Sequence, residues 1–259
     1  MPYFLSCLAI FKNEAVNLRE WIEHYLWQGV EHFYLINNGS TDNYKEVLEP
    51  YQNVISLFER PERYVQKKHY NEIFNTYIKG NSKWLAVVDL DEFFYCNRKL
   101  PIVKTVADLL LYYAPEEHAW GGLYSAWKLF GSSGIVHHPY GRVRESFVYR
   151  SDGCWQPKGI VLVDKVRTLD IHIHDHEGEV CYGEFLRLNH YAIQSQEFYS
   201  KVKMTRGDAT HEPSNTIRDV NYFIKYDYRD SIDDELKKLV EEDFQYKYPM
   251  HVQGSFPNE

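Results

Sequence analysis

Two aspartates directly after an apolar run are the residues of this sequence best suited to chemistry. Residues 84–88 (Trp-Leu-Ala-Val-Val) show no polar alternation, which predicts a strand buried on both faces, and Asp89, Asp91 and Glu92 follow it. Acids at the carboxyl end of such a strand lie where open α/β sheets bind ligands. Because clustered carboxylates repel one another unless cations or protons offset their charge, we interpret Asp89 and Asp91 as a site for a divalent metal ion and a diphosphate. The alternative is a solvated acidic turn, since D-x-D is a short motif.

Composition and charge restrict the class of protein. The 259 residues are 44% hydrophobic and 16% aromatic, which is ample for a packed core. The net charge of −8 argues against a nucleic-acid-binding surface. The four cysteines form no C-x-x-C pair, so reduced thiols are expected. No apolar run reaches membrane-spanning length and the amino terminus lacks a signal-peptide pattern, so we expect a cytoplasmic protein that could still lie at a membrane surface.

Strand-like and helix-like segments alternate through the first hundred residues. Short apolar runs follow one another with helical patterns between them, and Gly29, Pro50 and Gly80 end the three helices. Asn13 is the expected N-cap of the first helix. This β-α-β-α-β-α-β order at short spacing requires parallel strands joined by right-handed crossovers, as in a nucleotide-binding half-sheet. The expected strands are 5–11, 32–36, 54–58 and 84–88, and the third helix is 62–78.

The pattern changes after residue 100. A helix is expected over 105–113, where Thr105 and Asp108 can form a capping box. Residues 119–191 are rich in Gly, His and aromatics, which predicts a mixed, partly antiparallel half with short strands such as 159–163 and 169–173. A helix carrying Phe198 and Val202 should end at Gly207, residues 208–227 look irregular, and an amphipathic helix should begin near Ser231. We therefore expect one domain over 1–205 with a helical extension, 206–259, packed on it.

Three motifs in this order resemble the GT-A glycosyltransferases, and most closely family 92 and its family 2-like relatives. They are Ala9-Ile10-Phe11-Lys12-Asn13-Glu14, Asn37-Asn38-Gly39-Ser40-Thr41-Asp42 and Asp89-Leu90-Asp91-Glu92-Phe93, and the resemblance continues through 127–134, 158–161 and 188–191 to about residue 205. It implies an α/β GT-A fold with a Rossmann-like nucleotide-binding half (1–100), an acceptor half (101–205) and a mixed central sheet. It also implies metal-dependent, inverting transfer of a sugar from a nucleoside diphosphate, expected to be UDP, to a glycan hydroxyl.

The resemblance also assigns roles to individual residues. Asp91 would bind Mn²⁺ or Mg²⁺ directly, Asp89 would reach ribose or metal-bound water, and His190 would complete the metal or diphosphate site. An imidazole ligand suits Mn²⁺ better than Mg²⁺. Lys201 could pair with phosphate oxygens, although a solvated lysine is the plain alternative. The expected contacts to base or ribose are Phe11, Asn13, Glu14, Asn38 and Asp42.

Direct transfer with inversion needs a general base near the acceptor hydroxyl. Among the carboxylates of the acceptor half we favour Glu145, because it follows the Phe-Gly-Ser-Ser-Gly segment as a similar Glu does in relatives, and Asp152 is second. His172, His174 and His176 alternate, so a strand would place them on one face and permit a metal site. Acceptor hydrogen bonding or simple exposure is the favoured interpretation of these histidines.

Two rival functions remain open at this level. A haloacid-dehalogenase-type phosphatase also places D-x-D after an apolar strand, but its motif is expected on the first strand and followed by Gly-Thr instead of Glu92-Phe93. A non-catalytic protein that binds nucleotides or glycans would keep the fold without turnover, and the intact Asp89 and Asp91 argue against it.

Overall fold

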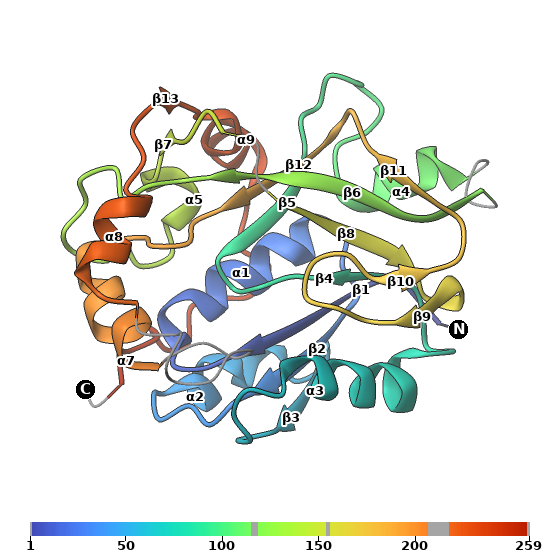
Figure 1. The fold of residues 1–259 in the computed structure, drawn as a ribbon, viewed down its shortest axis with the longest axis horizontal. Helices are drawn as coiled ribbons and strands as arrows, with labels where there is room; N and C mark the ends of the chain where they lie inside the picture. Colours follow the sequence, from blue (N-terminus) through green and yellow to red (C-terminus); the bar gives the residue numbers. More distant parts are fainter. Residues whose placement is uncertain (1, 115–118, 154–155, 207–217, 258–259) are drawn as a thin grey trace.

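A mixed nine-stranded sheet forms the centre of the protein (Figure 1). The computed structural model describes residues 2–114, 119–153, 156–206 and 218–257. The strand order is β3-β2-β1-β4-β8-β6-β12-β5, and β11 pairs with β6 outside this path. These strands are β1 (Tyr3–Phe11), β2 (His32–Asn37), β3 (Ile55–Glu59), β4 (Ser82–Val87), β5 (Glu92–Cys96), β6 (Trp120–Leu129), β8 (Pro157–Leu162), β11 (Glu179–Tyr182) and β12 (Leu186–His190).

Helices and short ribbons surround this sheet. Two small antiparallel pairs join β9 (Val166–Thr168) to β10 (Asp175–His176) and β7 (Tyr149–Arg150) to β13 (Ser231–Ile232). The helices of the first half are α1 (Ala15–Trp27), α2 (Tyr44–Leu48), α3 (Gln66–Ile73) with the π-helical turn Phe74–Ile78, and α4 (Val106–Tyr112). The second half holds α5 (Val143–Ser146), α6 (Gln196–Phe198), the π-helical turn Tyr199–Lys203, α7 (Met204–Arg206), α8 (Val220–Tyr226) and α9 (Glu235–Asp243).

Strand β1 explains why the central strands read as unbroken apolar runs. Its alternate residues Cys7 and Ala9 pack in the cluster that contains Trp21 of α1, whereas Leu8 and Ile10 pack in the cluster that contains Phe74. Both faces of the sheet are therefore covered, α1 lying on one and α3 with its π turn on the other. A strand buried on both faces accepts a polar side chain in its interior only where that side chain has a partner, and Ser6 within β1 is paired with Ser82 through their hydroxyl groups at 2.8 Å.

The structure confirms the predicted architecture and corrects several details. The parallel order β3-β2-β1-β4 and the antiparallel strand β8 confirm a parallel half-sheet continued by a mixed sheet. The Thr105–Asp108 capping box is present. Residues 169–173 are not a strand, because this segment bends between the β9–β10 pair. Residues 220–226, expected to be irregular, form α8, whose N-cap Asp219 accepts a hydrogen bond from the Tyr222 amide.

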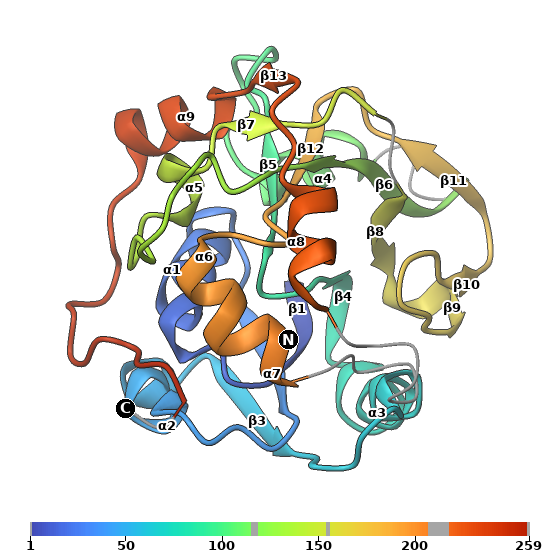
Figure 2. The same cartoon turned by 60° about the vertical axis from the view of Figure 1, so that its left-hand side comes forward.

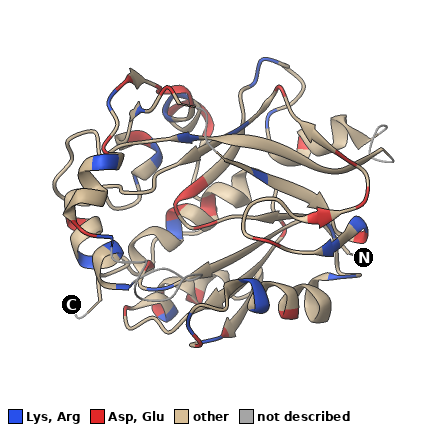
Figure 3. Ribbon diagram, in the orientation of Figure 1, with Lys and Arg blue, Asp and Glu red and all other residues tan. Residues whose placement is uncertain are grey.

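Figure 3 shows Lys and Arg interspersed with Asp and Glu along the described helices and strands. No helix within the described ranges is long and apolar enough to span a bilayer.

Candidate active site

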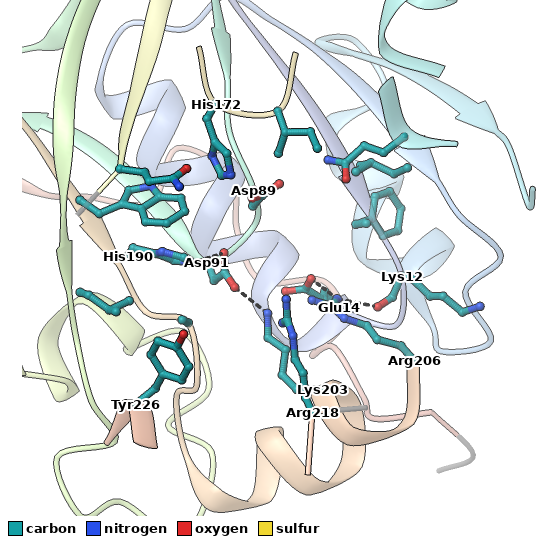
Figure 4. A pocket seen from close by; sticks show the side chains of 18 of the residues that line it. Lys12, Glu14, Asp89, Asp91, His172, His190, Lys203, Arg206, Arg218 and Tyr226 are labelled. Carbon is teal, nitrogen blue, oxygen red and sulfur yellow. Dashed lines mark hydrogen bonds and ion pairs between the residues drawn. The ribbon is translucent and has the colours of Figure 1, made fainter. Parts of the chain in front are cut away.

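A cavity of about 430 Å³ opens at the carboxyl edge of the sheet (Figure 4). Strands β1 and β4 are parallel, β8 runs antiparallel to both β4 and β6, and β12 is parallel to β6. The carboxyl ends of β1, β4, β6 and β12 therefore meet at one edge, where α/β sheets bind ligands. The lining residues are Ile10, Phe11, Lys12, Glu14, Asn38, Gln66, Asp89, Asp91, Trp127, Leu129, Gln156, Ile171, His172, His190, Ala192, Lys203, Arg206, Arg218, Tyr222 and Tyr226.

Strand pairing brings His190 to Asp91. In the antiparallel pair β12–β5, His190 stands opposite Glu92, and the backbone amide of Tyr191 donates to the Asp91 carbonyl at 2.8 Å. His190 Nε2 consequently lies 3.4 Å from Asp91 Oδ1, while Lys203 Nζ contacts Asp91 Oδ2 at 2.5 Å. The two residues are almost a hundred positions apart in sequence, and the sheet register alone makes them neighbours.

The charge on Asp91 is stabilised by its neighbours. Burial would raise the pKa of this carboxyl, but the charges of Lys203 and His190 outweigh burial and hold the pKa well below its ordinary value. The Lys203 side chain is only 1% exposed. Asp91 is therefore an ionised carboxylate inside the protein, and removing either partner of this pair would leave a buried charge uncompensated.

Asp89, which is partly exposed, belongs to a second charge cluster with the buried Lys158 and Glu92. Lys158 Nζ contacts Asp89 Oδ2 at 2.8 Å and Glu92 Oε2 at 2.9 Å, and the Asp89 backbone amide donates to Glu92 Oε2 at 2.9 Å. Burial lowers the pKa of Lys158, but the two carboxylates reverse that effect and raise it above its ordinary value. The Lys158-Gly159-Ile160-Val161 segment, seen in the sequence only as part of a resemblance, thus supplies the ammonium group that fixes the turn carrying Asp89.

Glu92 should make folding stability depend on pH. Burial raises its pKa from 4.5 to about 7. The folded state therefore binds more protons than the unfolded state between these values, so the contribution of Glu92 to the free energy of unfolding is lost as pH rises through this window. We expect the wild type to lose about 1–3 kcal/mol relative to Glu92→Gln between pH 5 and pH 7.5. Urea denaturation of both proteins across this pH range measures the difference. The buried histidines are common to both proteins, so their titration affects both profiles. Parallel profiles of stability against pH would contradict the prediction.

Basic side chains from the carboxyl-terminal part complete the cavity. Arg206 forms an ion pair with Glu14 and donates to the Lys12 carbonyl at 3.0 Å. Figure 4 shows Lys203, Arg206 and Arg218 together at the side of the cavity that faces Asp91 and Glu14. Among the described residues, four cationic side chains, Lys12 included, and three carboxylates line this cavity, so the site can bind an anionic ligand.

Lys201, the lysine selected from the sequence, lies outside this cavity. Its ammonium contacts Glu197 Oε1 at 3.1 Å and stands 4.5 Å from the centre of the Phe256 ring. The lysine that reaches Asp91 is Lys203. The π-helical turn Tyr199–Lys203 explains the difference, because its wider turn changes which residues share a face relative to α-helical spacing. The i, i+3 spacing of Lys203 and Arg206 was the sequence signal for a cationic face.

Asn13 and Asp42 join two loops and do not line the cavity. Asn13 is not the N-cap of α1; it has a positive φ of 56°, and its Oδ1 accepts from the Thr41 amide at 2.7 Å. Asp42 Oδ2 instead accepts from the Ala15 amide at 2.8 Å, at the start of α1. These bonds position Glu14 and Asn38, which do face the cavity. Asn38 of the N-N-G-S-T-D turn thus reaches the cavity itself, whereas Thr41 and Asp42 act through the residues they hold.

The two carboxylates proposed as general base also lie elsewhere. Glu145 is on α5, where its Oε1 is 3.4 Å from Arg142 Nη2. The Asp152 side chain is 63% exposed and accepts from Ser231 Oγ at 2.7 Å. Neither is among the cavity-lining residues.

The end of the cavity at Phe11 and Asn38 offers groups suited to a planar nucleobase. Phe11 is packed edge-on against Tyr44, with ring centres 5.6 Å apart. Asn38 Nδ2 donates to the carbonyls of Arg60 and Glu62, at 2.7 and 2.8 Å. Because both amide hydrogens are used, the Asn38 oxygen is the atom that can accept a hydrogen bond from a ligand.

The Asp91–His190 pair fits one side of a divalent metal site. Asp91 Oδ1 is buried and has no hydrogen-bond partner among the described residues. An octahedral ion with bonds of about 2.1 Å places adjacent ligands about 3 Å apart, close to the 3.4 Å between Asp91 Oδ1 and His190 Nε2. Within the described ranges no three His, Cys, Asp or Glu residues form such a group, so diphosphate oxygens and water would have to supply the other ligands. Of the alternating histidines, His172 lines the cavity, His174 accepts from the Asp170 amide, and His176 contacts the Tyr124 hydroxyl.

Comparison with known proteins bears on this architecture. A glycosyltransferase family 92 protein of Oryza sativa subsp. japonica is 27% identical over 213 residues, covering 78% of this chain and 35% of the relative. One from Arabidopsis thaliana is 24% identical over 228 residues, covering 80% and 38%. The chain thus spans about a third of the length of these curated relatives.

Similar solved structures include TarS of S. aureus. One structure of TarS has a TM-score of 0.44 and 11% identity, covering 86% of this chain and 43% of that chain. TarS residues 1–349 in complex with UDP-GlcNAc have a TM-score of 0.37 and 17% identity, covering 52% and 36%.

The sequence profile described as Glycosyltransferase family 92 matches residues 3–238. This match extends beyond residue 205, the end of the motif resemblance, and includes α8 with the two tyrosines that line the cavity. One explanation therefore covers the motifs, their order and the sheet that gathers them at one edge, and it confirms the GT-A interpretation of the fold. The chain belongs to glycosyltransferase family 92.

Proposed function

We propose that this protein transfers a sugar, with inversion, from a UDP-sugar to a hydroxyl group of a saccharide. The observation that carries the proposal is the arrangement of Asp89 and Asp91 opposite Lys203, Arg206 and Arg218 in one cavity. A nucleoside diphosphate sugar presents a base, an anionic diphosphate and a polar ring in that order, and the cavity offers matching chemistry along its length. Its volume, about 430 Å³, lies in the range typical of small-molecule sites.

The nucleotide would lie across the ends of β1 and β2. The Asn38 amide oxygen can accept from an imino N–H such as that of uracil, and Phe11 offers an apolar ring edge beside it. Glu14 and Asp89 line the path from this end toward Asp91, and carboxylates readily accept hydrogen bonds from ribose hydroxyls. These contacts support UDP as the donor nucleotide.

The diphosphate would lie between Asp91 and the basic side chains. Lys203 and Arg206 come from the same helical segment and can donate to phosphate oxygens, a guanidinium in bidentate fashion. Asp91 and His190 would hold Mn²⁺ or Mg²⁺ together with these oxygens. A bound divalent cation would neutralise the charge that grows on the departing diphosphate. The buried Lys203 keeps Asp91 ionised and ready to bind it.

A donor screen tests the proposal. The protein is incubated with UDP-glucose, UDP-galactose, UDP-N-acetylglucosamine, UDP-xylose or GDP-mannose in MnCl₂, MgCl₂ or EDTA, and release of nucleotide is measured. We expect slow hydrolysis of at least one UDP-sugar, faster with MnCl₂ than with EDTA. Calorimetry with UDP separates binding from turnover, so binding without hydrolysis or transfer would favour a non-catalytic binding protein. Equal rates in MnCl₂ and EDTA would remove the metal from the proposal.

Glu145→Gln and Asp152→Asn should retain activity within about twofold. Each carboxylate lies outside the cavity: Glu145 contacts Arg142, and Asp152 contacts Ser231. A general base must reach the acceptor hydroxyl within hydrogen-bond distance or through one water. Steady-state rates of donor turnover and of transfer measure the effect. A loss of transfer with donor hydrolysis intact would identify the affected residue as the base.

A further inference from the structure

Helix α8 presents one face to the cavity. Tyr222 and Tyr226 are four residues apart on one side of α8, Arg218 lies just before the helix, and all three line the cavity. The Arg218 guanidinium lies 5.5 Å from the centre of the Tyr222 ring, and the rings of Tyr222 and Tyr226 are 4.4 Å apart. Val220 and Ile224, at intervening positions, are 58% and 68% exposed. Figure 2 shows α7 and α8 in front of the sheet, at the carboxyl edge that carries the cavity.

Trp127 extends this aromatic surface from the other side. It lies near the carboxyl end of β6 and is held between two imidazole rings, with ring centres 5.1 Å from His172 and 4.4 Å from His190. Trp127 Nε1 and His172 Nδ1 are buried and have no hydrogen-bond partner among the described residues. Buried polar atoms are rarely left without partners, and polar groups of a ligand in the cavity could supply hydrogen bonds to these two. The rings that surround them make this a ligand with apolar surface as well.

We infer that Trp127, Tyr222 and Tyr226 form the binding surface for the saccharide acceptor. This inference rests on the proposed function and names the part of the cavity that receives the second substrate. A pyranose ring presents C–H groups on its faces and hydroxyls around its rim. Trp and Tyr match it, because each combines a large apolar ring with one polar atom at its edge. Basic residues dominate the end beside Glu14, whereas the surface beside His190 is aromatic.

His190 connects this aromatic surface to the diphosphate end of the cavity. His190 contacts Asp91 on one side and the Trp127 ring on the other. A donor whose diphosphate lies against Asp91 and Lys203 would therefore have its sugar next to Trp127. Tyr222 and Tyr226 line the same cavity, so an acceptor ring on this pair would share the cavity with that sugar.

Binding of simple glycosides tests the inference. Saturation-transfer NMR is recorded with methyl α- and β-glycosides of glucose, galactose, mannose, xylose and fucose, with and without UDP and MnCl₂. We expect at least one glycoside to receive saturation at its ring C–H protons. Tyr222→Ala and Tyr226→Ala should each weaken that glycoside about tenfold, and Tyr226→Phe, which keeps the ring, should weaken it less than threefold. Ile224→Ala, on the exposed side of the same helix, is the matched control and should leave glycoside affinity unchanged.

Calorimetry with UDP separates this inference from the proposed function. All four variants should bind UDP within about twofold of the wild type, which also shows that they are folded. Glycoside affinity that is unchanged in both alanine variants, or no glycoside binding by the wild type, would overturn the inference. Parallel loss of UDP and glycoside affinity would overturn it too, because α8 would then belong to the donor site. If UDP fails to bind the wild type, the proposed function fails, whereas the glycoside spectra recorded without UDP still decide this inference.

Discussion

Asp91→Asn is expected to lower UDP-sugar turnover in MnCl₂ by about a hundredfold or more while the protein stays folded. Asparagine keeps the shape of the side chain but removes the negative charge and one of the two oxygens. A divalent cation would lose its charged ligand, and Lys203 would face a neutral amide. Asparagine is preferred to alanine here, because alanine would leave the buried ammonium group beside an empty space.

The measurement is donor hydrolysis in MnCl₂ and in EDTA, with circular dichroism and thermal unfolding as checks on the fold. Asp152→Asn makes the same chemical change on a carboxylate that is 63% exposed, and it is the matched control. Turnover of Asp91→Asn equal to that of Asp152→Asn would show that the acidic pair does not serve the reaction.

Lys203→Met is expected to affect both stability and donor binding. It leaves the Asp91 carboxylate buried beside His190 alone, which should cost about 3–5 kcal/mol of the free energy of unfolding at neutral pH. It also removes a cation from the diphosphate end, so KM for the UDP-sugar should rise about tenfold or more. Lys201→Met, two residues away on a side chain that is 41% exposed, should change stability by less than about 0.5 kcal/mol and leave KM unchanged.

The double variant Asp91→Asn with Lys203→Met separates these two effects. Because no buried charge is left unpaired, most of the lost stability should return, whereas turnover should remain at the level of Asp91→Asn. Urea denaturation and donor kinetics of the four proteins give the coupling energy. Additive losses of stability would mean that the two side chains do not interact in solution as the 2.5 Å contact indicates.

Local chemistry in the sequence predicted much of the fold. The apolar run before Asp89 becomes β4, buried on both faces, and Thr105 forms the expected capping box with Asp108. These features depend on residues close in sequence, so patterns of apolarity and capping are enough to identify them. Segment 220–226 was missed because its tyrosines and exposed Val220 and Ile224 give no clear apolar stripe. Its packing includes the ring of Tyr199 against Phe223, a contact between segments that are separate in sequence.

By itself the sequence determined that acidic residues directly follow a buried strand, and the order of its motifs indicated the family. Only the tertiary structure decided which cations face those acids. Lys158 reaches Asp89 because β8 pairs with β4, His190 reaches Asp91 because β12 pairs with β5, and Lys203 replaces Lys201 because a π turn changes the helical face. Strand register and helical phase are set by packing across the whole domain, and a shift of one residue in either would turn these side chains away from the cavity.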